Sequence, residues 1–385
     1  MRSNVRLMQA KAPPPVVRLS DDDRVTLEEL NLAGRNHSMP LEALRHDITP
    51  VGLHYLLTHF DIPAVDLASW RLQVRGRVKR QLDLDLDHLR SLPVVDFAVT
   101  LECAGNGRAR LLPRPLSQPW LGEAVGTAVW TGTPLQNVLR AAEPAPDAGE
   151  VVFTGLDRGI QGDVEQQYER SLPLEEANRE EVMLCWAING RELPPQHGYP
   201  LRLIVPGWYG MTHVKWLRSI TLIQGPFTGY QQAAAYQFRP SEDAEPIPVT
   251  RMQPRALLIP PGIPEFLNRV RHMAPGPCRV EGRAWSGWGS VVNVEVSIDG
   301  GASWREAQLA EAVSPHAWRG WSFDWLAEPG DYELCCRATD ATGRRQPADP
   351  VWNLEGVCNN AVQRVRVNVG ATEMVQAAAD RPETG

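Results

Sequence analysis

Short apolar runs, some alternating with polar positions, recur along the first two thirds of the chain. Residues 70–78 alternate as a half-buried strand does, while 94–106, 150–157 and 199–207 are largely apolar and predict buried strands. Residues 132–144 carry apolar side chains at helical spacing, with Pro134 near their start, and predict a short helix. Strands mixed irregularly with short helices favour an α+β domain over a regular alternation of strand and helix.

After the proline-rich stretch 254–267 the pattern changes to closely spaced alternating runs. Residues 290–309 contain two such runs joined at Asp299-Gly300-Gly301, a hairpin signal because these residues tolerate positive φ. Residues 331–343 and 362–369 continue the alternation. Several short strands over about 100 residues predict a β-sandwich of the immunoglobulin type.

These changes of pattern divide the chain into four parts. Residues 1–30, first proline-rich and then acidic, are expected to form a mobile arm, and the small, polar residues 371–385 a disordered tail. The α+β domain is placed at 31–253 and the sandwich at 254–370.

Composition narrows the class of protein. The chain has 385 residues and a formal net charge of −7, which disfavours a nucleic-acid binder. No apolar run reaches the roughly 18–20 residues of a membrane helix, and the N-terminus lacks the apolar core of a signal peptide. We therefore expect a cytoplasmic protein, or a periplasmic one if a leader was removed before Met1. The six cysteines include no C-x-x-C pair, which argues against a structural zinc site, and a reducing compartment argues against disulfides.

Cys103 is the first candidate for chemistry. It ends an apolar run and is followed by Gly105 and Gly107, which let the backbone approach another group closely. Arg108 favours the thiolate and can also bind an anion. Three interpretations remain open from the residues: a buried structural thiol, a ligand for a soft metal, and a nucleophile. The nucleophile needs a nearby base, and none of its candidates lies in a recognisable hydrolase motif: His37, His197 and His213.

Three further stretches concentrate polar groups. Residues 34–40 hold Arg35, Asn36 and His37, although a solvated loop would explain them too. Residues 194–220 place basic side chains around a glycine-containing loop, an arrangement suited to a phosphate. Tyr236 lies in 230–238, where core packing is an equally good explanation.

Together these stretches resemble the sulfite oxidase family of mononuclear molybdenum enzymes. The matching blocks occur in the family's order over about residues 30–369: "RNHSMP", "TLECAGNGR", "HGYPLRLIVPG" with "VKWLRSI", and "RAWSG…VEVSIDGGASW…VWNLEGV". The resemblance implies a molybdopterin-binding catalytic domain of α+β type, followed by an immunoglobulin-like dimerisation domain. It also implies a homodimer, with no haem domain in this chain.

The resemblance assigns a role to each matching residue. Cys103 would be the protein's thiolate ligand on molybdenum, beside the dithiolene sulfurs of molybdopterin. An oxyanion pocket at the metal would be lined by Arg35, Arg108, Tyr236 and Trp120. The pterin would be held by Asn36, His37 and Asp157, and the phosphate end of the cofactor by His197, Arg202 and Lys215.

The implied reaction is oxidation of sulfite to sulfate by oxo transfer, with electrons passed to an external acceptor such as a cytochrome. Nitrate or sulfoxide reduction is the alternative within this chemistry. A cysteine-dependent hydrolase and a non-catalytic binding protein are alternatives outside it.

Two departures from the family pattern bear on the substrate. Vertebrate members have an arginine where "RAWSGWGS" places Ser290, so a positive charge is expected to be missing at the pocket rim, with Trp288 narrowing the entrance. The segment between Arg108 and Trp120, which forms the pocket mouth in the family, is slightly short.

Overall fold

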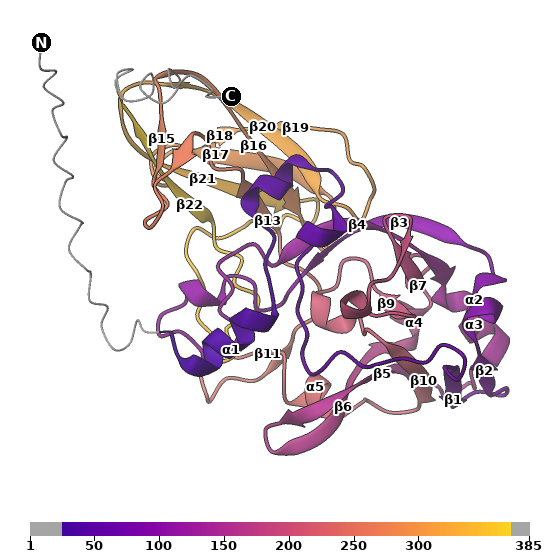
Figure 1. The fold of residues 1–385 in the computed structure, drawn as a ribbon. Coiled ribbons are helices and arrows are strands. Elements are labelled where there is room, and N and C mark those ends of the chain that lie inside the picture. The colour runs from indigo at the N-terminus through magenta and orange to yellow at the C-terminus, as the bar shows by residue number, and fades with distance from the viewer. Residues whose placement is uncertain (1–24, 371–385) are drawn as a thin grey trace, which may run out of the picture.

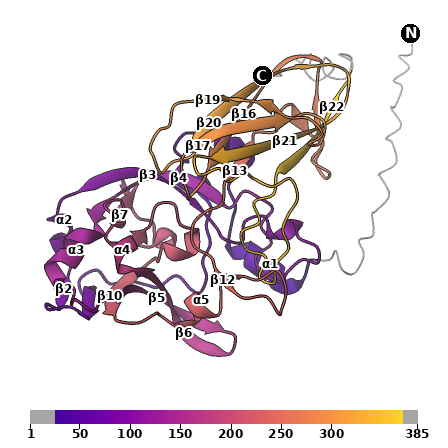
Figure 2. The ribbon, with the colours of Figure 1, turned by 180° about the vertical axis from the view of Figure 1, so that it is seen from behind.

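A computed structural model describes residues 25–370 of the chain (Figure 1). The indigo-to-pink part forms a mixed domain, and the orange-to-yellow part forms a sandwich at one end of it, in both views (Figures 1 and 2). The expected α+β domain followed by a β-sandwich is thus confirmed. The predicted tail and the first 24 residues of the predicted arm lie outside the described residues.

The mixed domain contains two sheets with a shared core. One has the strand order β2-β1-β10-β5-β6, and in it β1 pairs with β10 in parallel. Its strands are β1 (Leu72–Gly76), β2 (Leu82–Leu84), β5 (Glu150–Gln161), β6 (Val164–Pro173) and β10 (Leu217–Ile223). The other has the order β3-β4-β7-β8, with β9 also paired to β7, and is antiparallel. Its strands are β3 (Val95–Glu102), β4 (Val125–Pro134), β7 (Met183–Ile188), β8 (Arg191–Glu192) and β9 (Arg202–Ile204).

Short helices and turns complete this domain. The predicted helix is present as α3 (Leu135–Ala142), whose buried side chains Leu135, Val138 and Leu139 follow the helical period. The other α-helices are α2 (Leu86–Arg90), α4 (Leu174–Ala177) and α5 (Tyr230–Ala233). The 3₁₀ turns are η2 (Leu41–Arg45), η3 (Val51–Leu53), η4 (Arg108–Arg110), η5 (Pro195–His197) and η6 (Gly210–Thr212).

Helix α1 (Leu27–Arg35) begins inside the stretch predicted to be a mobile arm. Thr26 caps it, because the Thr26 hydroxyl accepts from the Glu29 amide while the Glu29 carboxylate accepts from the Thr26 amide. Glu29 is buried and also pairs with Arg114 at 2.8 Å. Reciprocal capping and this ion pair give the helix an anchor that the acidic composition of the arm did not reveal.

The sandwich has two facing sheets, of order β13-β16-β20-β19 and β14-β15-β22-β21-β17-β18. The first contains β13 (Arg255–Leu258), β16 (Gly276–Trp285), β19 (Gln308–Leu309) and β20 (Arg319–Ala327). The second contains β14 (Ile263–Pro264), β15 (Arg271–Met273), β17 (Val291–Ser297), β18 (Arg305–Glu306), β21 (Gly330–Asp340) and β22 (Gln363–Val369). The predicted hairpin joins β17 to β18, with Gly300 and Gly301 at φ of 71° and 97°. A small pair, β11 (Gln237–Phe238) and β12 (Ile247–Pro248), lies before the sandwich.

The two domains meet behind the end of β3. The Arg255 guanidinium pairs with Glu102 at 2.8 Å, and the Trp285 indole donates to the same carboxylate at 2.8 Å. Glu102 is fully buried, so this interdomain contact fixes the backbone immediately before Cys103.

All six cysteines lie within residues 25–370 and are free thiols there. In the same range, no group of three or more His, Cys, Asp or Glu side chains is placed to hold a metal ion. None of the helices described is long and apolar enough to cross a membrane.

Candidate active site

A tight turn holds Cys103 directly after β3. The Cys103 amide donates to the Ala124 carbonyl at 2.9 Å, and the Cys103 carbonyl accepts from the Asn106 amide at 3.0 Å. The buried Asn106 side chain donates to Glu102 and to the Gly122 carbonyl, and accepts from the Ala124 amide. Both the nitrogen and the oxygen of the Asn106 side-chain amide therefore stabilise the turn that carries the thiol.

The glycines in this turn make room for protein groups. A Cβ on Gly105 would lie 2.6 Å from the Arg108 guanidinium. Gly107 has a φ of 87°, and a Cβ there would lie 2.9 Å from the Asn359 carbonyl. The glycines do allow a close approach of the backbone, and the groups that come close are Arg108 and Asn359 of the same chain.

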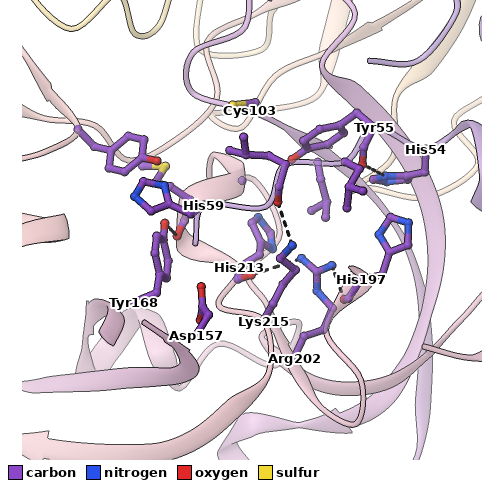
Figure 3. Close-up of a pocket in the computed structure, with 16 residues that line it drawn as sticks. His54, Tyr55, His59, Cys103, Asp157, Tyr168, His197, Arg202, His213 and Lys215 are labelled. Carbon is purple, nitrogen blue, oxygen red and sulfur yellow. Dashed lines mark hydrogen bonds between the residues drawn. The ribbon is translucent and has the colours of Figure 1, made fainter. Parts of the chain in front are cut away.

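Two adjoining cavities meet at Cys103, which lines both together with Leu57, His59 and Tyr236. The first cavity is lined by histidine and basic side chains from both ends of the 194–220 segment. The second is lined by Arg108, Trp120 and Asn36. Figure 3 shows the first cavity, with Cys103 at one end and Asp157, Arg202 and Lys215 at the other.

The basic end of the first cavity is built from Arg202 and Lys215. Arg202 is buried, and it donates to the His197 carbonyl at 3.0 Å and the His213 carbonyl at 3.3 Å, as Figure 3 shows in part. Lys215 donates to the Leu57 and Gln196 carbonyls at 2.9 and 3.0 Å. Burial lowers the pKa of Lys215 to about 7 and of Arg202 to about 10. Within residues 25–370 neither side chain forms an ion pair with a carboxylate, so an anion bound here would favour the charged form of both.

Unpartnered polar atoms mark the same cavity. Asp157 is buried in β5, its Oδ1 has no hydrogen-bond partner in the described chain, and burial raises its pKa to about 7 against the opposing effect of Lys215. His54 Nε2 and Arg202 Nε are also buried without a partner. Buried polar groups are normally satisfied, so these atoms fit a polar ligand. His54 was missed by the sequence analysis because no motif surrounds it.

The second cavity presents Arg108 beside Tyr236. Arg108 is buried and donates through Nε to the Glu355 carbonyl at 3.0 Å and through Nη1 to the Gln118 carbonyl at 3.2 Å. Tyr236 has a φ of 57°, and Arg170 lies 5.6 Å from the centre of its ring. Burial and the neighbouring Cys103 raise the pKa of Tyr236 to about 12. The buried Trp120 indole N–H points to the Cys103 thiol, and its hydrogen bond opposes the rise of the thiol pKa.

Arg35 and His37 lie outside both cavities. The Arg35 side chain is 43% exposed, and it donates to the Phe60 carbonyl at 2.7 Å and pairs with Asp61 at 3.4 Å. His37 is exposed and contributes its backbone to a bridge with Leu56. Asn36 does line the second cavity, but its amide is engaged with Gln118, Leu32 and Thr58.

His213 has no nitrogen free to act as a base for Cys103. Its Nδ1 accepts from the Val205 amide at 3.0 Å, so the proton is on Nε2, which donates to the Trp208 carbonyl at 3.1 Å. Burial raises the pKa of the Cys103 thiol, although the charge of Arg108 opposes this effect. His213 therefore cannot activate Cys103 as a nucleophile.

Ser290 and Trp288 do not reach the site. Ser290 is exposed on the sandwich, and the Trp288 ring stacks under Arg344 at 4.0 Å. Neither lines the two cavities, so the expectations of a missing charge at this rim and of a narrowed entrance are wrong for these residues. Glu355 occupies the second cavity instead. It belongs to the quoted block "VWNLEGV", but no local pattern indicates that this turn reaches Arg108.

Three buried histidines give the protein a testable pH dependence. Burial lowers the pKa of His54 to about 4, of His213 to about 3 and of His197 to about 2, from 6.5. Between pH 6.5 and 4 the unfolded chain therefore binds protons that the folded chain does not, and stability should fall as the pH falls. Each histidine lowers the free energy of unfolding by up to about 1.4 kcal/mol for each pH unit of acidification. Asp157, with its raised pKa, takes up a proton in the folded chain and offsets the effect of one histidine.

Urea unfolding at intervals from pH 7 to 4.5 measures this slope. His213→Gln should reduce the slope of the free energy of unfolding against pH by the contribution of one proton. Glutamine can accept from the Val205 amide and donate to the Trp208 carbonyl, and it does not titrate. An unchanged slope in this variant would refute the assignment of His213 as a buried neutral histidine.

Family models match both domains of the chain. A model described as an oxidoreductase molybdopterin binding domain matches residues 59–231, and one described as a Mo-co oxidoreductase dimerisation domain matches residues 256–370.

Curated relatives and a solved structure are similar over most of the chain. Mitochondrial sulfite oxidase from Mus musculus is 34% identical over 382 residues, covering 92% of this chain and 69% of the mouse protein. An NADH nitrate reductase from Brassica napus is 31% identical over 365 residues, covering 87% of this chain and 40% of the plant protein. The structure of the sulfane dehydrogenase SoxCD from Paracoccus pantotrophus matches with a TM-score of 0.75 and 26% identity, covering 87% of this chain and 86% of that one.

Proposed function

Because the chain belongs to the sulfite oxidase family of molybdopterin-dependent oxidoreductases, we propose that it oxidises sulfite to sulfate. Cys103 would bind the molybdenum of the cofactor, and an external acceptor such as a cytochrome would take the electrons. The observation that carries the proposal is the position of Cys103, whose side chain lines both the cavity with unpaired cations and the cavity with Arg108. We also propose that two copies of the chain pair through the sandwich, the part matched by the dimerisation model.

The residues of the first cavity fit a molybdopterin cofactor. Arg202 and Lys215, with His197 beside them, would hold its phosphate, since these cations are not neutralised by a carboxylate contact. The unpartnered Asp157 Oδ1 and His54 Nε2 would bind polar groups of the pterin. Among the residues expected to hold the pterin, Asp157 is better placed than Asn36 or His37.

The cofactor, when bound, would supply oxo-transfer chemistry and accept the two electrons that the oxidation releases. The chain's own residues bind and orient the substrate beside Cys103. Arg108 would hold an oxyanion, because its Nη2 has no partner among residues 25–370 and burial strengthens charge-assisted hydrogen bonds. With its raised pKa, Tyr236 keeps its hydroxyl proton at neutral pH and would donate it in a hydrogen bond to a substrate oxygen.

Nitrate reduction is the second candidate, favoured by the similarity to plant nitrate reductases. The molybdenum-loaded protein should reduce ferricyanide when sulfite is added. If nitrate-dependent oxidation of a reduced viologen dye were instead the only activity, the alternative would replace the proposal.

A further inference from the structure

A carboxylate lies in the cavity that is proposed to bind the oxyanion substrate. Glu355 is half-buried and lines the second cavity with Arg108 and Tyr236. Its Oε2 accepts from the Tyr236 amide at 2.7 Å, and its backbone carbonyl accepts from Arg108 Nε at 3.0 Å. Glu355 therefore contacts both Arg108 and Tyr236, the two residues that are proposed to bind the substrate.

The chain around Glu355 is built into this position. The connection between β21 and β22 leaves the sandwich and descends beside α1 in both views (Figures 1 and 2). There the Trp352 indole donates to the Pro113 carbonyl at 2.8 Å, and the Cys358 amide donates to the Ala104 carbonyl at 2.8 Å. Gly356 has a φ of 61°, and a Cβ on it would lie 2.7 Å from Arg108 Cγ. Hydrogen bonds and close packing therefore hold this turn against the turn that carries Cys103.

The charges around the second cavity are few. Besides Glu355, the charged side chains that line it within residues 25–370 are Arg108 and Arg239. Arg239 Nε is buried without a partner. His59, Cys103 and Tyr236 also line the cavity, and His59 Nε2 donates to Gln161 Oε1 at 2.7 Å. Burial raises the pKa of Glu355, while the charges of Arg239 and Arg108 oppose this effect; in its ionised form the carboxylate reduces the net charge of the cavity from +2 to +1.

We propose that Glu355 is a specificity-determining residue, which makes this site select oxyanions with a single negative charge over those with two. The inference rests on the proposed function. If sulfite oxidation is the reaction, the preferred form of the substrate is hydrogensulfite and not the sulfite dianion. The physical reason is that repulsion from a fixed carboxylate grows in proportion to the charge of the ligand. The same repulsion acts on sulfate, the doubly charged product, and favours its release.

Glu355→Gln tests the proposal, because the amide oxygen of glutamine can still accept from the Tyr236 amide while the charge is lost. Equilibrium binding of sulfate and of nitrate to the molybdenum-loaded protein is measured by calorimetry at fixed pH and ionic strength. Removing the charge should tighten nitrate about 3-fold and sulfate about 10-fold, because the Coulomb free energy doubles with ligand charge. Glu328→Gln, at an exposed position on the sandwich, changes the net charge equally and should leave both affinities unaltered.

Unchanged sulfate affinity in Glu355→Gln, or equal tightening of both anions, would overturn the proposal. If that variant does not fold, Glu355→Asn removes the same charge and should again tighten sulfate more than nitrate. Equal effects on the two anions there would also overturn the proposal. A wild-type protein that binds both anions but does not oxidise sulfite would refute the proposed function alone. Intact sulfite oxidation with unchanged anion selectivity in Glu355→Gln would refute only this inference.

Discussion

Replacing Cys103 with serine should lower the kcat for sulfite oxidation by more than about 100-fold, because loss of a residue that only supports a metal ligand already costs about 10- to 100-fold. Serine keeps the size of the side chain, and the turn is held by backbone and Asn106 hydrogen bonds that do not involve the thiol. The variant should therefore fold. It should also retain cofactor, because Arg202 and Lys215 lie at the other end of the first cavity (Figure 3). Ferricyanide reduction per bound molybdenum measures the loss.

Cys278→Ser is the matched control, since Cys278 is a partly buried free thiol on the sandwich. It should retain full activity per molybdenum. A Cys103→Ser variant that matched this control would show that the thiol is not needed by the metal, and the proposed ligand would be wrong.

Arg108→Gln should reduce kcat/KM for sulfite by about 10- to 100-fold. A hydrogen bond to a charged partner contributes about 1.5–3 kcal/mol, and glutamine removes the charge while it retains a donor. The fall should be accompanied by a weaker dependence of kcat/KM on salt, because less of the substrate's attraction to the site is electrostatic.

Arg158→Gln removes the same charge from an exposed position on β5, where Arg158 lies 3.8 Å from Glu165. Its kcat/KM should stay within about 2-fold of the wild type, as is usual for exposed ion pairs. If both variants showed the same loss, the effect would come from overall charge, and Arg108 would not be the substrate-binding group.

The order of apolar and polar positions was enough to predict several elements. Strand β1, helix α3 and the hairpin at Gly300 formed where the pattern placed them, because each depends on side chains close together in sequence. Likewise, Cys103, Arg202 and Lys215 stood in recognisable blocks, and the structure brings all three to one cavity.

Residues that depend on distant contacts were not predicted. Glu355 reaches Arg108 across 247 positions of sequence, so only the packing of the β21–β22 connection against the mixed domain reveals it. In the same way, Ser290 was interpreted from its block alone, although neither Ser290 nor Trp288 lines the two cavities. Arg35 and His37 flank Asn36, but only Asn36 is buried, and its two neighbours are exposed.

The central claim is that this chain uses a molybdenum site beside Cys103 to convert sulfite to sulfate. The most direct measurement is the amount of sulfate formed by the purified, molybdenum-loaded protein with ferricyanide as acceptor. The account predicts one sulfate for every two ferricyanide ions reduced, because the oxidation releases two electrons and ferricyanide accepts one. Molybdenum-loaded protein that forms no sulfate from sulfite would contradict it.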